Sequence, residues 1–378
     1  MVQPYLKDKM KKIVLTLIHL FIIQIVFSQK LTPGFDSDEY FELLKISSQQ
    51  GDSIYNPDLP LPEKHSRIYR SPVMGLDNRW ELWESEDSVG VISIRGTTTN
   101  QLSWVENFFC AMVPATGKIK LSDDFLFDYK LATDKDAAVH IGWLTAVGFL
   151  GRDILPKIDS LRSKGIEDFL IIGHSQGGSV ATLLAAYLEN LKSKGDLASS
   201  INFKTYSSAG PKPGNLYFAY DFEALTQNGW AFNVVNTADW VPEGPFSIQT
   251  TDDYNASNPF KLVDDGLKQL PFKQRIVLSR IYKNLETPPK KANKRYQKYL
   301  GKIIGNNIQE ALPGFEMPEL YNSNNYVRTG RQVILYANEE YFKIFPEKTD
   351  QIWNHHMFEA YFFLLNGTIV PMDKIKSN

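Results

Sequence analysis

The chain has 378 residues, of which 43% are hydrophobic and 22% charged, and its formal net charge at pH 7 is −2. This is the composition of an ordinary globular protein. It gives no electrostatic reason to expect a nucleic-acid partner, because nucleic-acid-binding domains are usually basic. The single cysteine, Cys110, excludes an intramolecular disulfide. The length allows either two domains or one domain with an insertion.

Residues 1–28 have the pattern of a secretory signal peptide. Four lysines precede an uncharged run over 13–27, and the small residue Ser28 follows it. A membrane anchor needs about 20 apolar residues, so an anchor is the weaker alternative. We therefore predict export to the periplasm or the medium, with a mature domain over 29–378. Export without disulfides is more typical of a bacterial protein than of a small extracellular scaffold.

The rest of the chain alternates between helix-like and strand-like segments. In chain order we expect a helix over 31–50, a surface loop over 49–72, strands over 80–85 and 89–94, a helix over 142–161, a strand over 168–172 with a helix over 179–188, and strands over 201–207 and 232–236. This order predicts an α/β fold with a mostly parallel sheet and helices on both faces.

Between about 245 and 325 the sequence becomes rich in Lys and Arg, and apolar residues recur at helical spacing. This pattern predicts a helical insertion. We interpret it as a solvated amphipathic cover over the sheet edge, and a membrane-binding face is the less favoured alternative. A strand over 326–336 and a helix beginning near residue 356 complete the chain.

Ser175 lies in the hexapeptide Gly173-His174-Ser175-Gln176-Gly177-Gly178, directly after the predicted strand 168–172. A G-x-S-x-G sequence between a strand and a helix is the nucleophile elbow of α/β-hydrolases. The turn is so tight that the flanking positions, Gly173 and Gly177, leave no room for a Cβ. We therefore predict that Ser175 is a nucleophile.

A serine nucleophile needs a base and an acid, which follow it along an α/β-hydrolase chain in the order acid, then His. Of the six histidines, only His355 and His356 lie well beyond Ser175. For the acid, Asp239 follows the predicted strand 232–236, where a loop leaves the carboxyl end of the sheet. The alternatives are that the two histidines merely begin a helix and that Asp239 caps a turn.

An oxyanion needs two backbone N–H donors. We expect one from Gln176, the residue after the nucleophile, and the other from Thr97, which follows the predicted strand 89–94. No metal or cofactor is expected, because Cys110 and the scattered histidines have no ligand spacing.

Six segments, taken together, resemble the class 3 lipases, the family of the secreted fungal triacylglycerol lipases and their plant and bacterial relatives. They are Ile94-Arg95-Gly96-Thr97 with Trp104 downstream, Val139-His140-Ile141-Gly142-Trp143, the hexapeptide around Ser175, Gly210-Pro211-Lys212-Pro213-Gly214-Asn215, Asn236-Thr237-Ala238-Asp239-Trp240-Val241-Pro242 and His356-Met357-Phe358-Glu359-Ala360-Tyr361. The resemblance covers about 85–365. It implies that Asp239 is the acid, and the spacing of the last segment favours His356 over His355.

The resemblance also implies a short lid helix after the oxyanion segment. Residues 100–109 contain the apolar stripe that such a lid needs, although an ordinary core helix fits it equally; the stripe consists of Leu102, Trp104, Val105, Phe108 and Phe109. The family gives His140 a structural role, and we expect Tyr361 to be a packing residue. Gln176 departs from the commoner Leu, which leaves the backbone donor intact and changes the pocket wall.

We therefore predict an exported serine hydrolase that cleaves the carboxylic esters of acylglycerols or phospholipids, with contact to a lipid surface. Within enzymes, the alternative is a soluble short-chain or feruloyl-type esterase. Outside enzymes, the alternative is a non-catalytic membrane- or partner-binding protein on a hydrolase scaffold.

Overall fold

The computed structural model describes residues 30–51 and 59–366. The predicted signal peptide, residues 1–28, lies outside the described residues. The chain divides into two units, residues 1–32 and 33–378. Everything that follows concerns the second unit.

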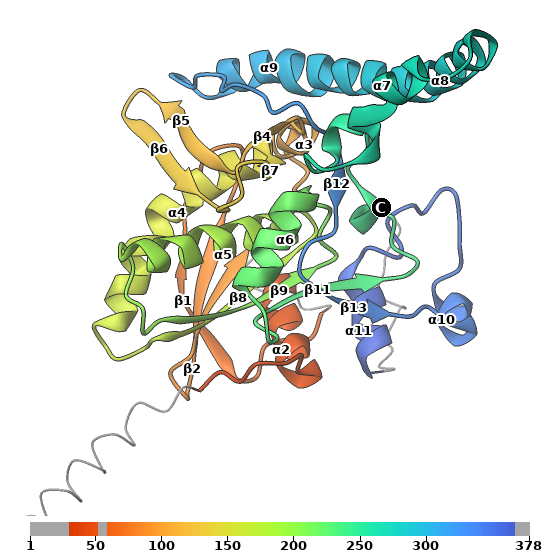
Figure 1. Ribbon diagram of the computed structural model, residues 1–378. Coiled ribbons are helices and arrows are strands. Elements are labelled where there is room, and N and C mark those ends of the chain that lie inside the picture. The colour runs from red at the N-terminus through yellow and green to blue at the C-terminus, as the bar shows by residue number, and fades with distance from the viewer. Residues whose placement is uncertain (1–29, 52–58, 367–378) are drawn as a thin grey trace, which may run out of the picture. The chain divides into compact units, whose positions relative to one another are not determined.

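A seven-stranded sheet forms the centre of this unit, in the order β1-β2-β3-β8-β9-β11-β13 (Figure 1). The strands are β1 (His65–Arg70), β2 (Trp80–Ser85), β3 (Gly90–Ile94), β8 (Asp168–His174), β9 (Asn202–Ser208), β11 (Ala231–Asn236) and β13 (Arg331–Leu335). The first three strands pair antiparallel, and every pairing from β3 to β13 is parallel. The carboxyl ends of five strands therefore meet at one edge of the sheet.

Helices cover both faces of the sheet. They are α2 (Ser37–Ser48), α4 (Ile141–Arg162), α5 (Gln176–Lys194), α6 (Leu216–Leu225), α10 (Glu339–Ile344) and α11 (Phe358–Asn366). Ile171 of β8 packs in the main core with Leu144 of α4 and Leu183 of α5. On the opposite face, Tyr206 of β9 stacks on Tyr40 of α2 with ring centroids 5.7 Å apart. Successive strand side chains alternate between faces, which explains the two layers, and the predicted α/β-hydrolase architecture is confirmed.

Two smaller sheets lie beside the main one. The first has the order β12-β10-β7-β4, and the second is the hairpin β5-β6. Their strands are β4 (Met112–Pro114), β5 (Thr116–Ser122), β6 (Phe125–Lys130), β7 (Ala138–His140), β10 (Gly214–Asn215) and β12 (Tyr326–Val327). The sequence does not predict most of these short strands.

The segment predicted to be a helical insertion contains a row of helices (Figure 1). They are η2 (Thr251–Asp253), η3 (Pro259–Leu262), α7 (Val263–Lys268), α8 (Phe272–Tyr296), the π-helical η4 (Gln297–Ile303) and α9 (Ile304–Ala311). The short helix η1 (Val241–Glu243) comes just before this segment. Within residues 30–51 and 59–366, no helix has both the length and the apolar character needed to span a bilayer.

Two sequence expectations are wrong. The segment 49–72, expected to be a loop, contains β1, whose residues His65–Arg70 include two arginines that hid the strand pattern. The segment 326–336, expected to be one strand, is divided between β12 of the small sheet and β13 of the main sheet. Gly330, with a φ of 90°, turns the chain between the two.

Candidate active site

Ser175 lies in a sharp turn between β8 and α5. Its φ is 61° and its ψ is −134°, a conformation that strains a residue carrying a side chain. The two flanking glycines are required because a Cβ on Gly173 would lie 2.1 Å from the Gly177 carbonyl oxygen, and a Cβ on Gly177 would lie 2.5 Å from the Ile94 carbonyl oxygen. The hexapeptide therefore folds as the tight elbow that its glycines predict.

His356 connects the serine to an acid. Its Nε2 lies 2.8 Å from the Ser175 hydroxyl oxygen, and its Nδ1 lies 2.7 Å from Asp239 Oδ2. Asp239 belongs to the loop after β11, and His356 belongs to the turn before α11. Both side chains are buried. The chain thus brings together the three residues that the sequence singled out, across sequence separations of 181 and 117 residues.

Both oxygens of the Asp239 carboxylate accept hydrogen bonds. Oδ1 accepts a hydrogen bond from the Val241 backbone N–H at 2.9 Å. Oδ2 accepts one from the Tyr361 hydroxyl at 2.8 Å, in addition to its contact with His356. The expectation that Tyr361 is only a packing residue is therefore wrong, because its hydroxyl donates a hydrogen bond to Asp239.

His355 does not take part in the hydrogen bonds that connect Ser175, His356 and Asp239. Its Nδ1 lies 2.8 Å from the Tyr341 hydroxyl. His174 instead supports the segment that carries the base, because its Nε2 donates to the His356 carbonyl oxygen at 2.8 Å and its Nδ1 accepts from the Ser208 hydroxyl at 2.9 Å. Burial holds the pKa of His174 well below its ordinary value, so this ring is neutral.

The two residues expected to form the oxyanion hole contact each other. The Thr97 hydroxyl donates to Gln176 Oε1 at 2.9 Å. Gln176 is the first residue of α5, so its backbone N–H is among those without a partner inside the helix. A Cβ on Gly96 would lie 3.4 Å from Ser175 Cβ, so the loop carrying Thr97 passes directly beside the nucleophile.

Glu106 lies beneath this pair and is fully buried. Its Oε1 accepts from Gln176 Nε2 at 2.6 Å, and its Oε2 accepts from Asn78 Nδ2 at 2.5 Å. Burial raises the pKa of Glu106 from about 4.5 to about 8, against the opposing effect of these two hydrogen bonds, and nearby Asp77 raises it further. Glu106 is not among the residues that the sequence patterns single out, although an acidic residue inside an apolar stripe is a signal that a buried partner exists.

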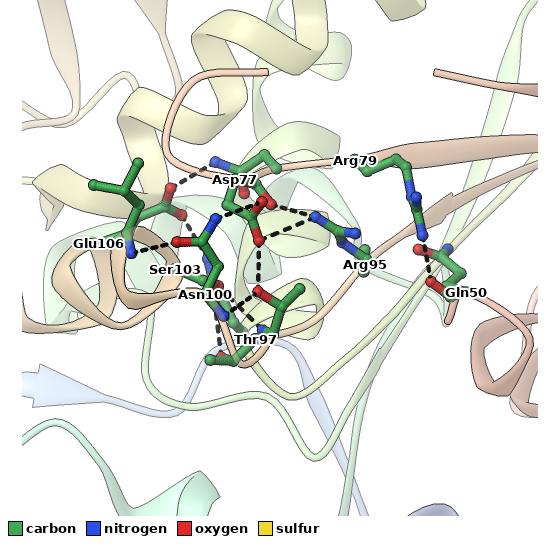
Figure 2. Close-up of polar contacts among 12 residues, drawn as sticks. Gln50, Asp77, Arg79, Arg95, Thr97, Asn100, Ser103 and Glu106 are labelled. Carbon is green, nitrogen blue, oxygen red and sulfur yellow. Dashed lines mark hydrogen bonds and ion pairs between the residues drawn. The ribbon is translucent and has the colours of Figure 1, made fainter. Parts of the chain in front are cut away.

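Figure 2 shows the polar network around the Thr97 loop. The Asp77 carboxylate accepts from the Thr98 hydroxyl at 2.5 Å and from Asn100 Nδ2 at 3.2 Å, and Arg95 Nη2 lies 3.2 Å from it. The Ser103 hydroxyl donates to Gln176 Oε1 at 3.3 Å. Asp77 and Gln176 therefore hold the loop after β3 and the start of α3 in place through side-chain hydrogen bonds.

Asn107 ties the same loop to α4. Its Nδ2 donates to the Thr97 hydroxyl oxygen at 2.9 Å, and its Oδ1 accepts from Trp143 Nε1 at 2.9 Å. His140 Nε2 donates to the Asn107 carbonyl oxygen at 3.2 Å. Burial lowers the pKa of His140 to about 3, so this ring is neutral, in keeping with a structural role.

The segment expected to be a lid forms α3 (Gln101–Phe108). Trp104 is 36% exposed and Phe108 is 52% exposed, whereas Leu102 and Val105 are half-buried. Phe109 follows the helix and is buried against Phe315 in the main core. The lid function stays a prediction.

An aromatic cluster lies next to His356. The Trp353 ring lies 5.8 Å from the His356 ring, 5.8 Å from the Trp104 ring and 5.0 Å from the Trp240 ring, measured between centroids.

In the described parts of the chain, no group of His, Cys, Asp and Glu side chains could hold a metal ion.

Comparison with known proteins shows that the chain is similar to lipases. Residues 91–248 match the family model of lipase (class 3). This match contains the Thr97 loop, the elbow and Asp239. The chain is also 27% identical over 195 residues to the secreted mono- and diacylglycerol lipase 1 of Fusarium solani, an alignment that covers 49% of each protein. The chain thus spans about half the length of the curated relative that it matches.

Solved structures of fungal lipases are similar to this chain as well. Lipase II from Rhizopus niveus is 20% identical, covers 55% of this chain with 74% of its own length, and gives a TM-score of 0.40. The triacylglyceride lipase of Rhizomucor miehei is 17% identical, covers 57% of this chain with 77% of its own length, and gives a TM-score of 0.41. Over residues 91–248, the chain is therefore similar to the class 3 lipases.

Proposed function

We propose that this protein is a serine hydrolase that cleaves the carboxylic esters of acylglycerols. The observation that carries the proposal is the chain of hydrogen bonds from Ser175 through His356 to Asp239, at 2.8 and 2.7 Å. These distances lie within the range that proton transfer between a nucleophile and its base requires. The match of residues 91–248 to the lipase (class 3) model supports the same reaction class.

The chemistry proceeds in two steps through an acyl-enzyme. The Ser175 hydroxyl oxygen attacks the ester carbonyl carbon while its proton passes to His356 Nε2, and the imidazolium then protonates the leaving alcohol. The oxygen of a water molecule then attacks the acyl carbon while one of its protons passes to the same nitrogen, and the imidazolium returns that proton to the Ser175 oxygen as the carboxylic acid leaves. Asp239 stabilises the imidazolium through Nδ1, and the backbone N–H groups of Thr97 and Gln176 bind the oxyanion.

An apolar acyl chain suits the surroundings of the base. The aromatic cluster of Trp104, Trp240 and Trp353 lies beside His356, and the first two side chains are partly exposed. Such a surface accepts an alkyl chain more readily than a charged substrate. The relative from Fusarium solani, whose printed name is a mono- and diacylglycerol lipase, supports acylglycerols as the substrate class.

Export is part of the proposal. The basic residues, the uncharged run and Ser28 within 1–28 form a signal-peptide pattern, and the relative from Fusarium solani is named as secreted. Expression of the full chain, followed by N-terminal sequencing of the protein in the medium or periplasm, tests this point. A protein that stays inside the cell with its first residues intact contradicts export.

The activity is tested with p-nitrophenyl esters of increasing chain length and with emulsified mono-, di- and triacylglycerols. Ser175→Ala should lower kcat by about 10⁴-fold or more, because the nucleophile is absent. His356→Ala should do the same, whereas His355→Ala, the matched control one residue away, should keep most of the activity.

The outcomes separate the alternatives. No turnover of any ester by the wild type contradicts the enzyme proposal and favours a binding protein on a hydrolase scaffold. Turnover of short or feruloyl esters alone, with no activity on emulsions, keeps the mechanism and replaces the acylglycerol substrate. Loss of activity in His355→Ala but not in His356→Ala contradicts the assignment of the base.

A further inference from the structure

The helix α8 carries an unusual concentration of positive charge. Its 25 residues include eight Lys or Arg and a single acidic residue, Glu286, although the whole chain has a formal net charge of −2. The basic residues are Lys273, Arg275, Arg280, Lys283, Lys290, Lys291, Lys294 and Arg295. The helix is one of the row that includes α7 and α9 in Figure 1.

One side of α8 packs against the rest of the unit. Glu286 accepts from the Thr251 hydroxyl at 2.8 Å, Lys290 pairs with Asp252 at 3.2 Å, and the Tyr296 hydroxyl lies 3.0 Å from Cys110 Sγ. Glu286 and Lys290 lie one helical turn apart, and Asn293 and Tyr296 are the buried residues of this helix. The second half of α8 is therefore anchored to the rest of the unit.

The first half of α8 exposes large aliphatic side chains. Val277, Ile281 and Leu285 recur every four residues, and Leu278 lies next to them, so the four form one stripe. Their side chains are between 44% and 72% exposed. A solvated helix cover does not need such a stripe, because its outer face is normally polar.

A basic stripe runs beside the aliphatic one. At 3.6 residues per turn, Lys273, Arg280, Lys291 and Lys294 fall on the outward side away from both the inward contacts and the aliphatic stripe. All four are exposed. An exposed aliphatic stripe flanked by Lys and Arg is the pattern of a helix that lies in the plane of a membrane surface.

We propose that α8 binds an anionic lipid surface, with Val277, Leu278, Ile281 and Leu285 in the acyl region and the basic stripe on the headgroups. The charges match, because anionic headgroups attract clustered Lys and Arg. A second copy of the chain fits less well, because it would bring a like-charged α8 against this one. Nucleic acid would pair with the basic stripe and leave the aliphatic stripe in water.

This proposal goes beyond ester hydrolysis and does not depend on it. The test therefore uses the full chain carrying Ser175→Ala, which removes the proposed nucleophile, and measures flotation with vesicles. Vesicles of phosphatidylcholine alone are compared with vesicles containing phosphatidylserine. We expect binding to the second kind only, weakening as salt rises because the headgroup attraction is screened.

Two groups of substitutions in the same background test the two stripes. Arg280→Glu with Lys291→Glu should weaken binding to phosphatidylserine vesicles by about ten-fold or more, because each basic residue contributes to the attraction. Ile281→Ser with Leu285→Ser should weaken it by a comparable factor. Thermal unfolding of each variant checks that the fold is intact.

Matched controls come from other exposed positions. Arg162→Glu with Lys164→Glu changes two exposed basic residues at the end of α4, and Leu126→Ser changes an exposed leucine on β6. Neither should alter vesicle binding by more than about two-fold, since non-specific charge effects are screened.

Three results overturn the proposal. The first is no flotation of the parent protein with phosphatidylserine vesicles at low salt. The second is flotation that the α8 substitutions and the controls reduce equally. The third is binding to DNA or to an acidic polypeptide at least as tight as binding to vesicles and indifferent to Ile281→Ser with Leu285→Ser, because such a partner uses the charges alone.

Discussion

The substitution Glu106→Gln tests whether the buried carboxyl beneath the oxyanion residues controls stability. Glu106 is fully buried between Gln176 and Asn78, and its pKa is raised to about 8 by burial. In the unfolded chain the group ionises near its ordinary value of about 4.5. Between these two values the native protein holds a proton that the unfolded chain has released.

The direction and size of the pH dependence of folding stability follow from proton linkage. The native state binds more protons between pH 4.5 and about 8, so stability falls as the pH rises through this window. Each pH unit corresponds to about 1.4 kcal/mol, and the whole window therefore amounts to at most about 5 kcal/mol. Below the window both states are protonated, and above it both are ionised, so the contribution stops changing.

The variant removes this dependence, because an amide has no proton to lose. It also brings an amide NH₂ against one of the two donors, Asn78 or Gln176, which costs about 1–3 kcal/mol at every pH. The assay is urea unfolding of both proteins from pH 5 to pH 9, with Glu310→Gln on the exposed side of α9 as the control for removing one negative charge. As the pH rises, the free energy of unfolding of the variant should increase by several kcal/mol relative to that of the wild type. A difference that stays constant across this range refutes the reasoning.

Three further changes test the contacts of the candidate site. Tyr361→Phe removes the hydroxyl that donates to Asp239 Oδ2 and should lower kcat on p-nitrophenyl esters by about ten-fold, because a hydrogen bond to a charged group is worth about 1.5–3 kcal/mol; unchanged kcat means that the hydroxyl does not orient the acid. Asn107→Ala removes the donor to the Thr97 hydroxyl and should lower kcat several-fold with little change in KM, so a rise in KM alone argues against a role in the oxyanion hole. Cys110 is buried, which raises the pKa of its thiol to about 12, so a thiol reagent should label it only in urea, and rapid labelling of the native protein contradicts that burial.

The sequence predicts which residues meet at the centre of the candidate site because its signals are local. A glycine pattern of six residues determines the elbow, and the position of Asp239 follows from the parallel sheet, in which loops leave the carboxyl ends of neighbouring strands at one edge. His356 could be separated from the other histidines because it follows Ser175 along the chain. Its choice over His355 needed the spacing of the family motif as well.

The supporting contacts were not predictable in the same way. Glu106 contacts Asn78 and Gln176, which are 28 and 70 residues away along the chain, and no local pattern encodes such a pairing. The strands of the small sheet are two or three residues long, which is too short for an alternating pattern. The hydroxyl of Tyr361 was overlooked because an aromatic residue on a helix is usually explained by packing alone.

The Gln176 side chain hydrogen-bonds to both the Thr97 loop and α3. In place of an apolar residue after the nucleophile, its side-chain amide accepts from Thr97 and Ser103 and donates to Glu106. Ser103 and Glu106 belong to α3, so the helix is bonded to the first residue of α5. Moving α3 away as a rigid lid would separate this buried polar network, at the cost of unpaired groups. The contacts therefore favour an α3 whose backbone, like the Thr97 loop, stays in place.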